Sequence, residues 1–403
     1  MKSLRRYLNC LAALAIAAAS LTACSSGGSD EPDNPVDPSK PDTTKTTDVL
    51  ETAKAGRVVI AYAPYYRENR LPNPKIVTNI NYAFAEVFVN GNTYTKFEVH
   101  NRQLFDKIRA LKSQNSQLKI SLSFTHSTEV DGHVNEGGFS KLVASEANRK
   151  KFAQDCLKFC QTEGIDGIDL DWEFPGLRYS SAAPAIDTKN DVANFTLLVK
   201  QLRETLGDRY LLTFAGYVMD KRQTDDGGWK YIDLAAVQPY VDFVNLMTYD
   251  MDAAFDGGQG KFNFTSGGYQ SGITSAKSYW DIMRTIREYQ AAGFPMSKMV
   301  LGIPFYVRVS FDGNPLSIYD YNQLATLGAG FSIDNWDSES NTPFVTYNGK
   351  FYGSYDNAES ISIKGRKFIG GYQMKGMLYW ESGEDDARYT LSKAVWNAVM
   401  KSY

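Results

Sequence analysis

Cysteine, histidine and net charge are all scarce in this chain. Its 403 residues include four cysteines and three histidines, and the formal net charge is −3. The three histidines (His100, His126 and His133) are too few and too scattered for a metal site built on imidazoles. The near-neutral charge also lacks the basic surface that is typical of nucleic-acid-binding proteins. We therefore expect no metal, no other cofactor and no nucleic-acid partner.

The apolar segment near the start of the chain is short. Residues 11–21 follow a basic N-terminus and are too few to span a bilayer stably, a pattern typical of a signal peptide. The segment ends in Leu-Thr-Ala-Cys24, which resembles the lipobox of bacterial lipoproteins. This resemblance implies removal of residues 1–23, acylation of Cys24 and a lipid anchor in a bacterial membrane of the cell envelope. An ordinary signal peptide with a chance cysteine is the alternative.

Large apolar residues are almost absent from residues 24–55, which are rich in Ser, Asp, Pro, Thr and Lys. Such a segment cannot bury enough surface to fold, so it is predicted to be a flexible tether. Beyond it, only Cys156 and Cys160 remain as cysteines, four residues apart on a helical pattern. We expect two buried free thiols in preference to a disulfide or a metal pair.

Short apolar runs recur eight times in the rest of the chain, at 58–62, 80–85, 118–123, 166–173, 211–215, 243–249, 299–304 and 376–380. Helical patterns are predicted at about 101–114, 140–162, 190–206, 275–292 and 385–400. Alternating strands and helices favour parallel pairing with right-handed crossovers. The sequence therefore predicts an α/β fold, a (β/α)8 TIM barrel over 56–403, with its active site at the C-terminal strand ends.

The segment at about 309–360, between the seventh and eighth strands, does not fit a simple barrel. It is rich in Tyr, Asn, Gly and Ser, and Asn348-Gly349 lies between two aromatic, β-branched runs. That arrangement is a strong hairpin signal. We predict a small α+β insertion in the barrel.

The fourth run carries the strongest chemical signal, because Asp169, Asp171 and Glu173 alternate with large apolar residues. In an extended strand, side chains two residues apart share one face and are spaced by about 6.7 Å. Three carboxyl groups beside an apolar layer raise at least one pKa and share protons. An enzyme that needs a carboxylic acid protonated near neutral pH can use such a group. Asp166, on the other face, is expected to fix the end of the strand.

The run Asp-Gly-Ile-Asp-Leu-Asp-Trp-Glu over 166–173 matches the DxxDxDxE signature of glycoside hydrolase family 18, the chitinase-like enzymes. Residues 80–85, 247–250 and 301–306 resemble the second, sixth and seventh strands of that family. Trp380, at the end of the eighth run, matches its sugar-stacking tryptophan. The resemblance extends over the whole folded part of the chain.

This resemblance implies a retaining mechanism in which the acetamide oxygen of the sugar attacks C1 and forms an oxazolinium intermediate. Glu173 would protonate the glycosidic oxygen and later act as base for water. Asp171 would orient the acetamide and stabilise the positive charge, while Asp169 would share its proton. Tyr249 would hydrogen-bond the acetamide oxygen.

Further family positions imply contacts with substrate, directly or through the acidic residues: Tyr62, Phe84, Ser123, Met247, Asp250, Tyr306, Arg308 and Trp380. Tyr62 and Ser123 match positions that hydrogen-bond behind the acidic residues. Phe84 and Trp380 would form an apolar floor under the reacting sugar. For Phe84 and Met247, plain barrel packing is an equally open interpretation.

One departure from the family concerns the third strand. Ser123 is followed by Phe124, Thr125 and His126, where the family usually has glycines in the last two places. Those glycines shape a loop beside the acceptor side of the cleft. The way in which this chain holds the leaving group is therefore left open.

The expected function is hydrolysis of β-1,4 bonds between N-acetylglucosamine units, in chitin or chitooligosaccharides, by a monomer. An endo-β-N-acetylglucosaminidase acting on N-glycan cores would use the same groups. Trp172 within the signature, the 247–250 run and the insertion favour the chitinase branch. A non-catalytic surface lectin is a third interpretation, but such family members typically lose the acid that Glu173 supplies.

Overall fold

The computed structural model describes residues 49–403 except 69, 126–128, 131–132, 135–137, 177–188, 218–230, 252, 256–261, 265–268, 275–280 and 310–317. The chain divides into two units, Met1–Thr44 and Lys45–Tyr403, and every described residue belongs to the second. The expected signal peptide, Cys24 and most of the expected tether lie outside the described residues, as does His126. No helix in the described part of the chain combines the length and apolarity needed to cross a bilayer.

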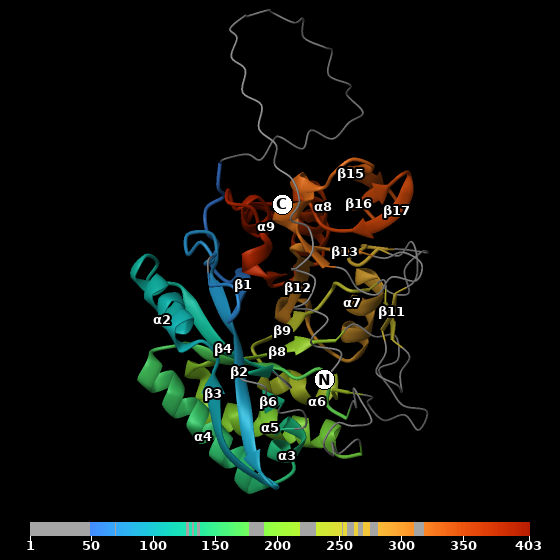
Figure 1. Cartoon of the computed structure of the whole chain (residues 1–403). Coiled ribbons are helices and arrows are strands. Elements are labelled where there is room, and N and C mark those ends of the chain that lie inside the picture. The colour runs from blue at the N-terminus through green and yellow to red at the C-terminus, as the bar shows by residue number, and fades with distance from the viewer. Residues whose placement is uncertain are drawn as a thin grey trace, which may run out of the picture. The chain divides into compact units, whose positions relative to one another are not determined.

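Eight parallel strands close into a barrel, which confirms the predicted fold (Figure 1). In spatial order they are β1 (Val58–Pro64), β2 (Asn79–Asn90), β4 (Lys119–Thr125), β7 (Gly167–Asp171), β8 (Leu211–Gly216), β9 (Phe243–Leu246), β12 (Met299–Pro304) and β18 (Gly376–Trp380). The barrel closes where β18 pairs with β1, in the register Val58 to Gly376. All eight predicted runs form strands, although β7 and β9 end sooner than the apolar pattern suggests.

The described helices are α2 (Arg102–Ala110), α3 (Gly138–Val143), α4 (Glu146–Glu163), α5 (Asp191–Leu206), α6 (Leu234–Val237), α7 (Ile282–Ala291), α8 (Ala358–Lys364) and α9 (Thr390–Met400). The single helix predicted over 140–162 is instead two helices. The break lies at Ser145, whose hydroxyl accepts a hydrogen bond from the backbone N–H of Asn148 and caps α4. Gly207 and Gly293, which follow the C-terminal ends of α5 and α7, have φ values of 62° and 85°.

Short 3₁₀ segments complete the helical elements: η2 (Leu111–Ser113), η3 (Gly207–Arg209), η4 (Gln238–Tyr240), η5 (Met296–Lys298), η6 (Tyr321–Thr326) and η8 (Ser382–Glu384). A π-helical turn, η7 (Gly365–Gly371), follows α8. Two small hairpins, β5 (Glu129–Val130) with β6 (His133–Val134) and β10 (Ala253–Phe255) with β11 (Phe262–Phe264), lie outside the main sheet.

One strand of the main sheet has no counterpart among the predicted elements. β2 continues past the barrel and pairs antiparallel with β3 (Thr93–Val99), forming the long blue hairpin of Figure 1. Side chains of α4 satisfy part of the outer edge of β3: Asn148 accepts from the N–H of Tyr94, and Lys151 donates to the carbonyl of Thr95. The hairpin is therefore held against α4.

The insertion between β12 and β18 forms a five-stranded antiparallel sheet (Figure 1, orange). Its strands, in spatial order, are β14 (Ile318–Asp320), β13 (Tyr306–Val309), β17 (Lys350–Ser354), β16 (Thr342–Tyr347) and β15 (Phe331–Asp337). The hairpin expected at Asn348-Gly349 joins β16 to β17, with φ values of 48° and 76° in the turn. Because β13 starts two residues after β12 ends, the insertion grows directly from the C-terminal end of a barrel strand.

A fully buried ion pair ties this sheet to α8. The ammonium of Lys364 donates to both carboxylate oxygens of Asp356, at 2.6 and 2.7 Å. The hydroxyls of Ser271 and Ser360 donate to the same carboxylate, each at 2.6 Å. Burial lowers the pKa of Lys364, and Asp356 opposes that shift. Removing either partner would leave the other charge in the core.

Other residues discussed from the sequence lie in the core or at the start of β7. Cys156 and Cys160 are both buried free thiols on α4, and burial raises their pKa values. Trp172 is buried and stacks on Phe139, with ring centroids 5.2 Å apart. Asp166 accepts a hydrogen bond from the backbone N–H of Ile120, so it fixes the start of β7.

Candidate active site

The three alternating acids lie at the C-terminal end of β7. Asp169 and Asp171 belong to the strand, whereas Glu173 follows two residues after its end. Asp169 is completely buried, Asp171 is 6% exposed, and Glu173 is partly exposed. The carboxyl groups therefore step from the barrel interior toward solvent. Only Asp169 and Asp171 are part of the regular strand, so the predicted alternation of acids continues one step beyond the hydrogen-bonded sheet.

Four strands direct hydrogen-bond donors at the deepest acid. Oδ2 of Asp169 accepts from the hydroxyls of Tyr62 (2.9 Å) and Ser123 (2.7 Å). Its Oδ1 accepts from the hydroxyl of Thr213 (2.6 Å) and the amide of Asn245 (3.0 Å). Burial raises the pKa of Asp169, and these four hydrogen bonds oppose the shift. The carboxyl group is locked in one orientation.

The pKa values of the two outer acids, Asp171 and Glu173, are raised more strongly. Burial, then the charge of Glu173, and then that of Asp169 hold the pKa of Asp171 well above its usual range. Its Oδ1 is buried and has no hydrogen-bond partner among the described residues. Burial, followed by the charge of Asp250, raises the pKa of Glu173 to about 7. The outermost carboxyl group is therefore available as an acid near neutral pH.

Aromatic side chains border the acids. Tyr249, after β9, is partly exposed, and burial together with the charges of Asp171 and Glu173 raises its pKa. Its hydroxyl therefore stays protonated and can donate. Phe84 and Trp380, both partly exposed, stack with centroids 5.8 Å apart and an interplanar angle of 24°. Trp380 also contacts the ring of Tyr62 at 5.6 Å.

Met247 is placed differently from Phe84. It is partly exposed and packs against the outer core between strands and helices, whereas Phe84 packs with Trp380 against the barrel interior. Packing of the barrel thus accounts for much of the Met247 side chain. Phe84 instead contributes a ring to the open end.

The insertion provides the partners of Asp250. Oδ1 of Asp250 accepts from the hydroxyl of Tyr306 at 2.6 Å and from Nε of Arg308 at 2.9 Å. Its Oδ2 forms an ion pair with the same guanidinium. Tyr306 and Arg308 both belong to β13 and are buried. The strand that starts the insertion therefore fixes a carboxylate beside Glu173.

A close approach between β9 and β12 sets the position of Tyr249. The hydroxyl of Thr248 donates to the carbonyl of Gly302 and accepts from its N–H, both at 2.8 Å. A Cβ at Gly302 would lie 2.2 Å from the carbonyl oxygen of Leu246 and 2.9 Å from the Tyr249 ring. Only glycine allows this approach.

A second charged cluster includes Glu381, the residue that follows Trp380 in the chain. Arg67 donates to both oxygens of Asp320 at 3.0 and 2.9 Å and forms an ion pair with Glu381. The hydroxyl of Tyr66 donates to Glu381 at 2.5 Å. Arg67 thus joins the loop after β1, the insertion and the end of β18.

Two residues of the site were missed by sequence reasoning. Thr213 and Asn245 complete the shell around Asp169, but both lie outside the segments that resemble family motifs. A signal for both was present, because each is a polar residue inside an otherwise apolar run. In a strand whose interior face is packed, such a residue needs a polar partner.

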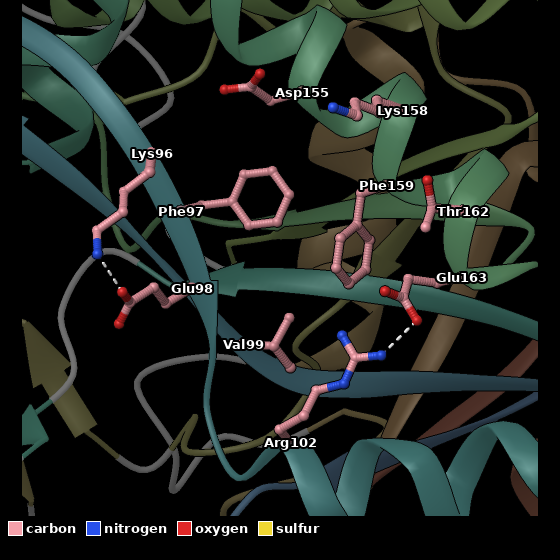
Figure 2. Close-up of a pocket in the computed structure, with 10 residues that line it drawn as sticks. All are labelled: Lys96, Phe97, Glu98, Val99, Arg102, Asp155, Lys158, Phe159, Thr162 and Glu163. Atoms are coloured by element: carbon pink, nitrogen blue, oxygen red, sulfur yellow. Dashed lines mark hydrogen bonds and ion pairs between the residues drawn. The ribbon is translucent and has the colours of Figure 1, made fainter.

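A separate pocket of about 530 Å³ lies outside the barrel, between β3, α2 and α4 (Figure 2). Phe97 and Phe159 line it in edge-to-face contact, with ring centroids 5.3 Å apart, and none of the predicted site residues lines it. Four of its charged residues form two pairs, Lys96 with Glu98 and Arg102 with Glu163 (Figure 2). The pocket has no part in the acidic cluster.

Comparison with known proteins decides the family. The model for Glycosyl hydrolases family 18 matches residues 58–385, a range that includes all eight barrel strands. The chain belongs to glycosyl hydrolase family 18. Every site residue described above lies within the matched range, so the acidic cluster is part of the shared family 18 domain.

Relatives of this family 18 chain are similar over most of its length. Chitinase A1 of Niallia circulans is 29% identical over 318 residues, covering 70% of this chain and 42% of the relative. A probable endochitinase of Caenorhabditis elegans is 29% identical over 352 residues, covering 78% and 52%. The chain thus spans about half the length of these curated relatives.

Among solved structures, a family 18 N-acetylglucosaminidase from Paenibacillus barengoltzii is similar over almost its whole length. The TM-score is 0.69 at 28% identity, covering 85% of this chain and 99% of that one.

Proposed function

We propose that this family 18 chain hydrolyses β-1,4 linkages between N-acetylglucosamine units, in chitin or chitooligosaccharides, with retention at C1. The observation that carries the proposal is the graded cluster at the end of β7: a partly exposed acid with a pKa of about 7 beside two buried carboxyls. The chitinases among its relatives support the substrate class.

The first step cleaves the glycosidic bond. Protonated Glu173 donates its proton to the glycosidic oxygen while the acetamide oxygen of the same sugar attacks C1. The C1–O bond breaks, the leaving sugar departs as an alcohol, and the new C1–O bond closes an oxazolinium ring. The pKa near 7 keeps a proton on Glu173 at neutral pH and lets the group act as base afterwards.

Asp171 faces the positive charge that develops in this step. Its buried Oδ1 has no hydrogen-bond partner among the described residues, so it is available to accept a hydrogen bond from the acetamide N–H of the substrate. A carboxylate at that place orients the nucleophile and stabilises the cation in a partly desolvated site. Asp169, held by four donors, keeps a second carboxyl behind it to share a proton.

The surrounding side chains hold the sugar. The Tyr249 hydroxyl donates to the acetamide oxygen and aims it at C1. Phe84 and Trp380 provide an apolar floor for the ring, and Asp250, fixed by Tyr306 and Arg308, is available to sugar hydroxyls. Water then attacks C1 from the face of the departed sugar and gives a proton to Glu173. The C1–O bond of the oxazolinium ring breaks and restores the acetamide, so the configuration at C1 is retained.

The test is a product profile on N-acetylglucosamine oligomers of defined length, with Glu173→Gln as the inactive variant. We expect turnover by the wild type, loss of at least 10³-fold in kcat for the variant, and retained oligosaccharide binding. Glu98→Gln is the matched control, since Glu98 is an exposed carboxylate paired with Lys96 on β3. Wild-type activity in Glu173→Gln would contradict the assignment of Glu173 as the general acid.

Two alternatives have distinct outcomes when a high-mannose glycoprotein is assayed beside the oligomers. Cleavage of a high-mannose glycoprotein with chitooligosaccharides untouched would assign an endo-β-N-acetylglucosaminidase acting on N-glycan cores. Oligosaccharide binding without any turnover would assign a surface lectin. The Paenibacillus barengoltzii N-acetylglucosaminidase supports a further candidate, release of single sugars from a chain end, which would give monosaccharide as the first product.

We also propose that Cys24 is acylated after removal of residues 1–23, and that the protein acts as a lipid-anchored monomer in the bacterial cell envelope. The support is the sequence pattern around Cys24, which lies outside the described residues. Metabolic labelling with an alkyne fatty acid should mark the wild type and not Cys24→Ser. A Cys24→Ser protein that still partitions with membranes would contradict the anchor, and an oligomer by light scattering would contradict the monomer.

A further inference from the structure

The register between β4 and β7 places one further hydroxyl beside the acids. These strands pair in parallel, Ser123 with Asp169 and Thr125 with Asp171. The hydroxyl of Ser123 reaches Asp169 at 2.7 Å, so both side chains lie on the interior face. Two residues further on, side chains return to the same face. Thr125 therefore stands beside Asp171 as Ser123 stands beside Asp169, one layer nearer the open end.

No equivalent group comes from the other neighbouring strand. β8 pairs Thr213 with Asp169 and Phe214 with Leu170, so the next residue, Ala215, lies opposite Asp171. The two strands that flank β7 thus offer two hydroxyls to Asp169 but only one to Asp171. Thr125 is as buried as Asp171, each being 6% exposed, so the pair is shielded from water.

We propose that Thr125 is a positioning residue for Asp171: its hydroxyl donates to the carboxylate oxygen Oδ1 and holds Asp171 in the orientation that receives the acetamide. Oδ1 is the buried oxygen without a partner among the described residues, and its two lone pairs let it accept from Thr125 as well as from the acetamide N–H. Ser123 demonstrates that a hydroxyl on β4 reaches a carboxylate on β7 in this register. In this structure the two groups are not hydrogen-bonded, and a staggered χ1 rotamer that turns the Thr125 hydroxyl toward β7 would make the same contact one layer higher.

The inference rests on the proposed function and predicts the direction of a pH effect. A donated hydrogen bond stabilises the ionised carboxylate and so lowers the pKa of Asp171, against the burial that raises it. The other titrating groups around Asp171 are Asp169 and Glu173 from its own segment, Tyr62 from β1 and Tyr249 after β9. At the interior positions of β4 and β8 beside these acids lie Ser123, Thr125, Thr213 and Ala215, none of which titrates.

The test compares Thr125→Ser with Thr125→Ala, two variants that both lack the methyl group and differ only by the hydroxyl. kcat/KM is measured from pH 4 to 9 on a fluorogenic chitooligosaccharide. We expect Thr125→Ala to move the acidic limb upward by about 0.5–1 pH unit and to lower kcat about three- to tenfold at pH 5, with a smaller change in KM. Thr125→Ser should keep the wild-type profile.

Thr285→Val is the control for loss of a buried threonine hydroxyl, since Thr285 lies on α7 and donates only to a backbone carbonyl, that of Asp281. It should leave the profile unchanged. Identical acidic limbs for Thr125→Ala and wild type would overturn the positioning role, as would a shifted limb in Thr125→Ser. A wild type without turnover would instead reject the proposed function itself. If Thr125→Ala does not fold, Thr125→Val, which keeps the side-chain shape, replaces it.

Discussion

The contact at Gly302 makes a sharp prediction for Gly302→Ala. The added methyl would lie 2.2 Å from the carbonyl oxygen of Leu246, where a carbon–oxygen contact needs about 3.3 Å. The obstacle is backbone in a paired strand, so β9 and β12 must separate by roughly 1 Å. Overpacking of this kind costs about 1–3 kcal/mol, and we expect Tm to fall by roughly 2–8 °C.

The same substitution should act on catalysis through Tyr249, whose ring would be 2.9 Å from the methyl group. A displacement near 1 Å in a positioning group lowers kcat by on the order of 10²-fold. Two assays decide the prediction: thermal unfolding, and turnover of a fluorogenic chitooligosaccharide. Gly328→Ala is the matched control, because a Cβ there meets nothing within 4 Å.

A double-mutant cycle with Tyr249→Phe separates the two effects. If Gly302 acts through Tyr249, adding Gly302→Ala to Tyr249→Phe should lower kcat much less than it does in the wild type. A Gly302→Ala enzyme with wild-type Tm and kcat would refute the packing argument. Equal losses in both backgrounds would refute the route through Tyr249.

Three further predictions concern the titrating and buried charges. Because the pKa of Glu173 is about 7, kcat/KM should fall as pH rises beyond that value, and a profile flat to pH 9 would contradict the role of Glu173 as acid. The raised pKa also means that the folded state prefers protonated Glu173. Because the ordinary pKa of this carboxyl is 4.5, the free energy of unfolding should fall as the pH rises from 4.5 through about 7. Glu173→Gln should therefore raise Tm relative to wild type at pH 8 but not at pH 4, and an equal difference at both pH values would sink the argument. Lys364→Met should cost about 3–5 kcal/mol in urea unfolding, because Asp356 would stay buried without its cation, while Lys364→Met with Asp356→Leu should recover much of the loss. Lys401→Met, at the exposed C-terminus, is the control, and its free energy of unfolding should stay within about 0.5 kcal/mol of wild type. If Lys364→Met were as stable as the double variant, the buried charge of Asp356 would not be the cause of the loss.

The barrel strands were predictable because their signal is local. Each is an apolar run, and the alternation of runs with helical patterns determines the fold class. β3 was missed because its exposed face carries Lys96 and Glu98, so it lacks an apolar run. The break in the helix over 140–162 depends on a side-chain cap at Ser145, which competes with helix continuation and leaves little trace in an apolar pattern.

The site was less predictable because it depends on register between strands. The positions of Asp169, Asp171 and Glu173 follow from their spacing, but the spacing does not say which neighbours face them. Thr213 and Asn245 reach Asp169 only once β8 and β9 are aligned beside β7. Likewise, Arg308 follows from the resemblance, whereas its bond to Asp250 requires β13 to start directly after β12.

Closure of the barrel by β1 and β18 has a consequence during synthesis. The first strand leaves the ribosome more than 300 residues before its partner, since Val58 pairs with Gly376. Until the last strand emerges, β1 and β12 each keep an open edge that can pair with other chains. A protein truncated before Gly376 would therefore expose both edges to pairing with other chains.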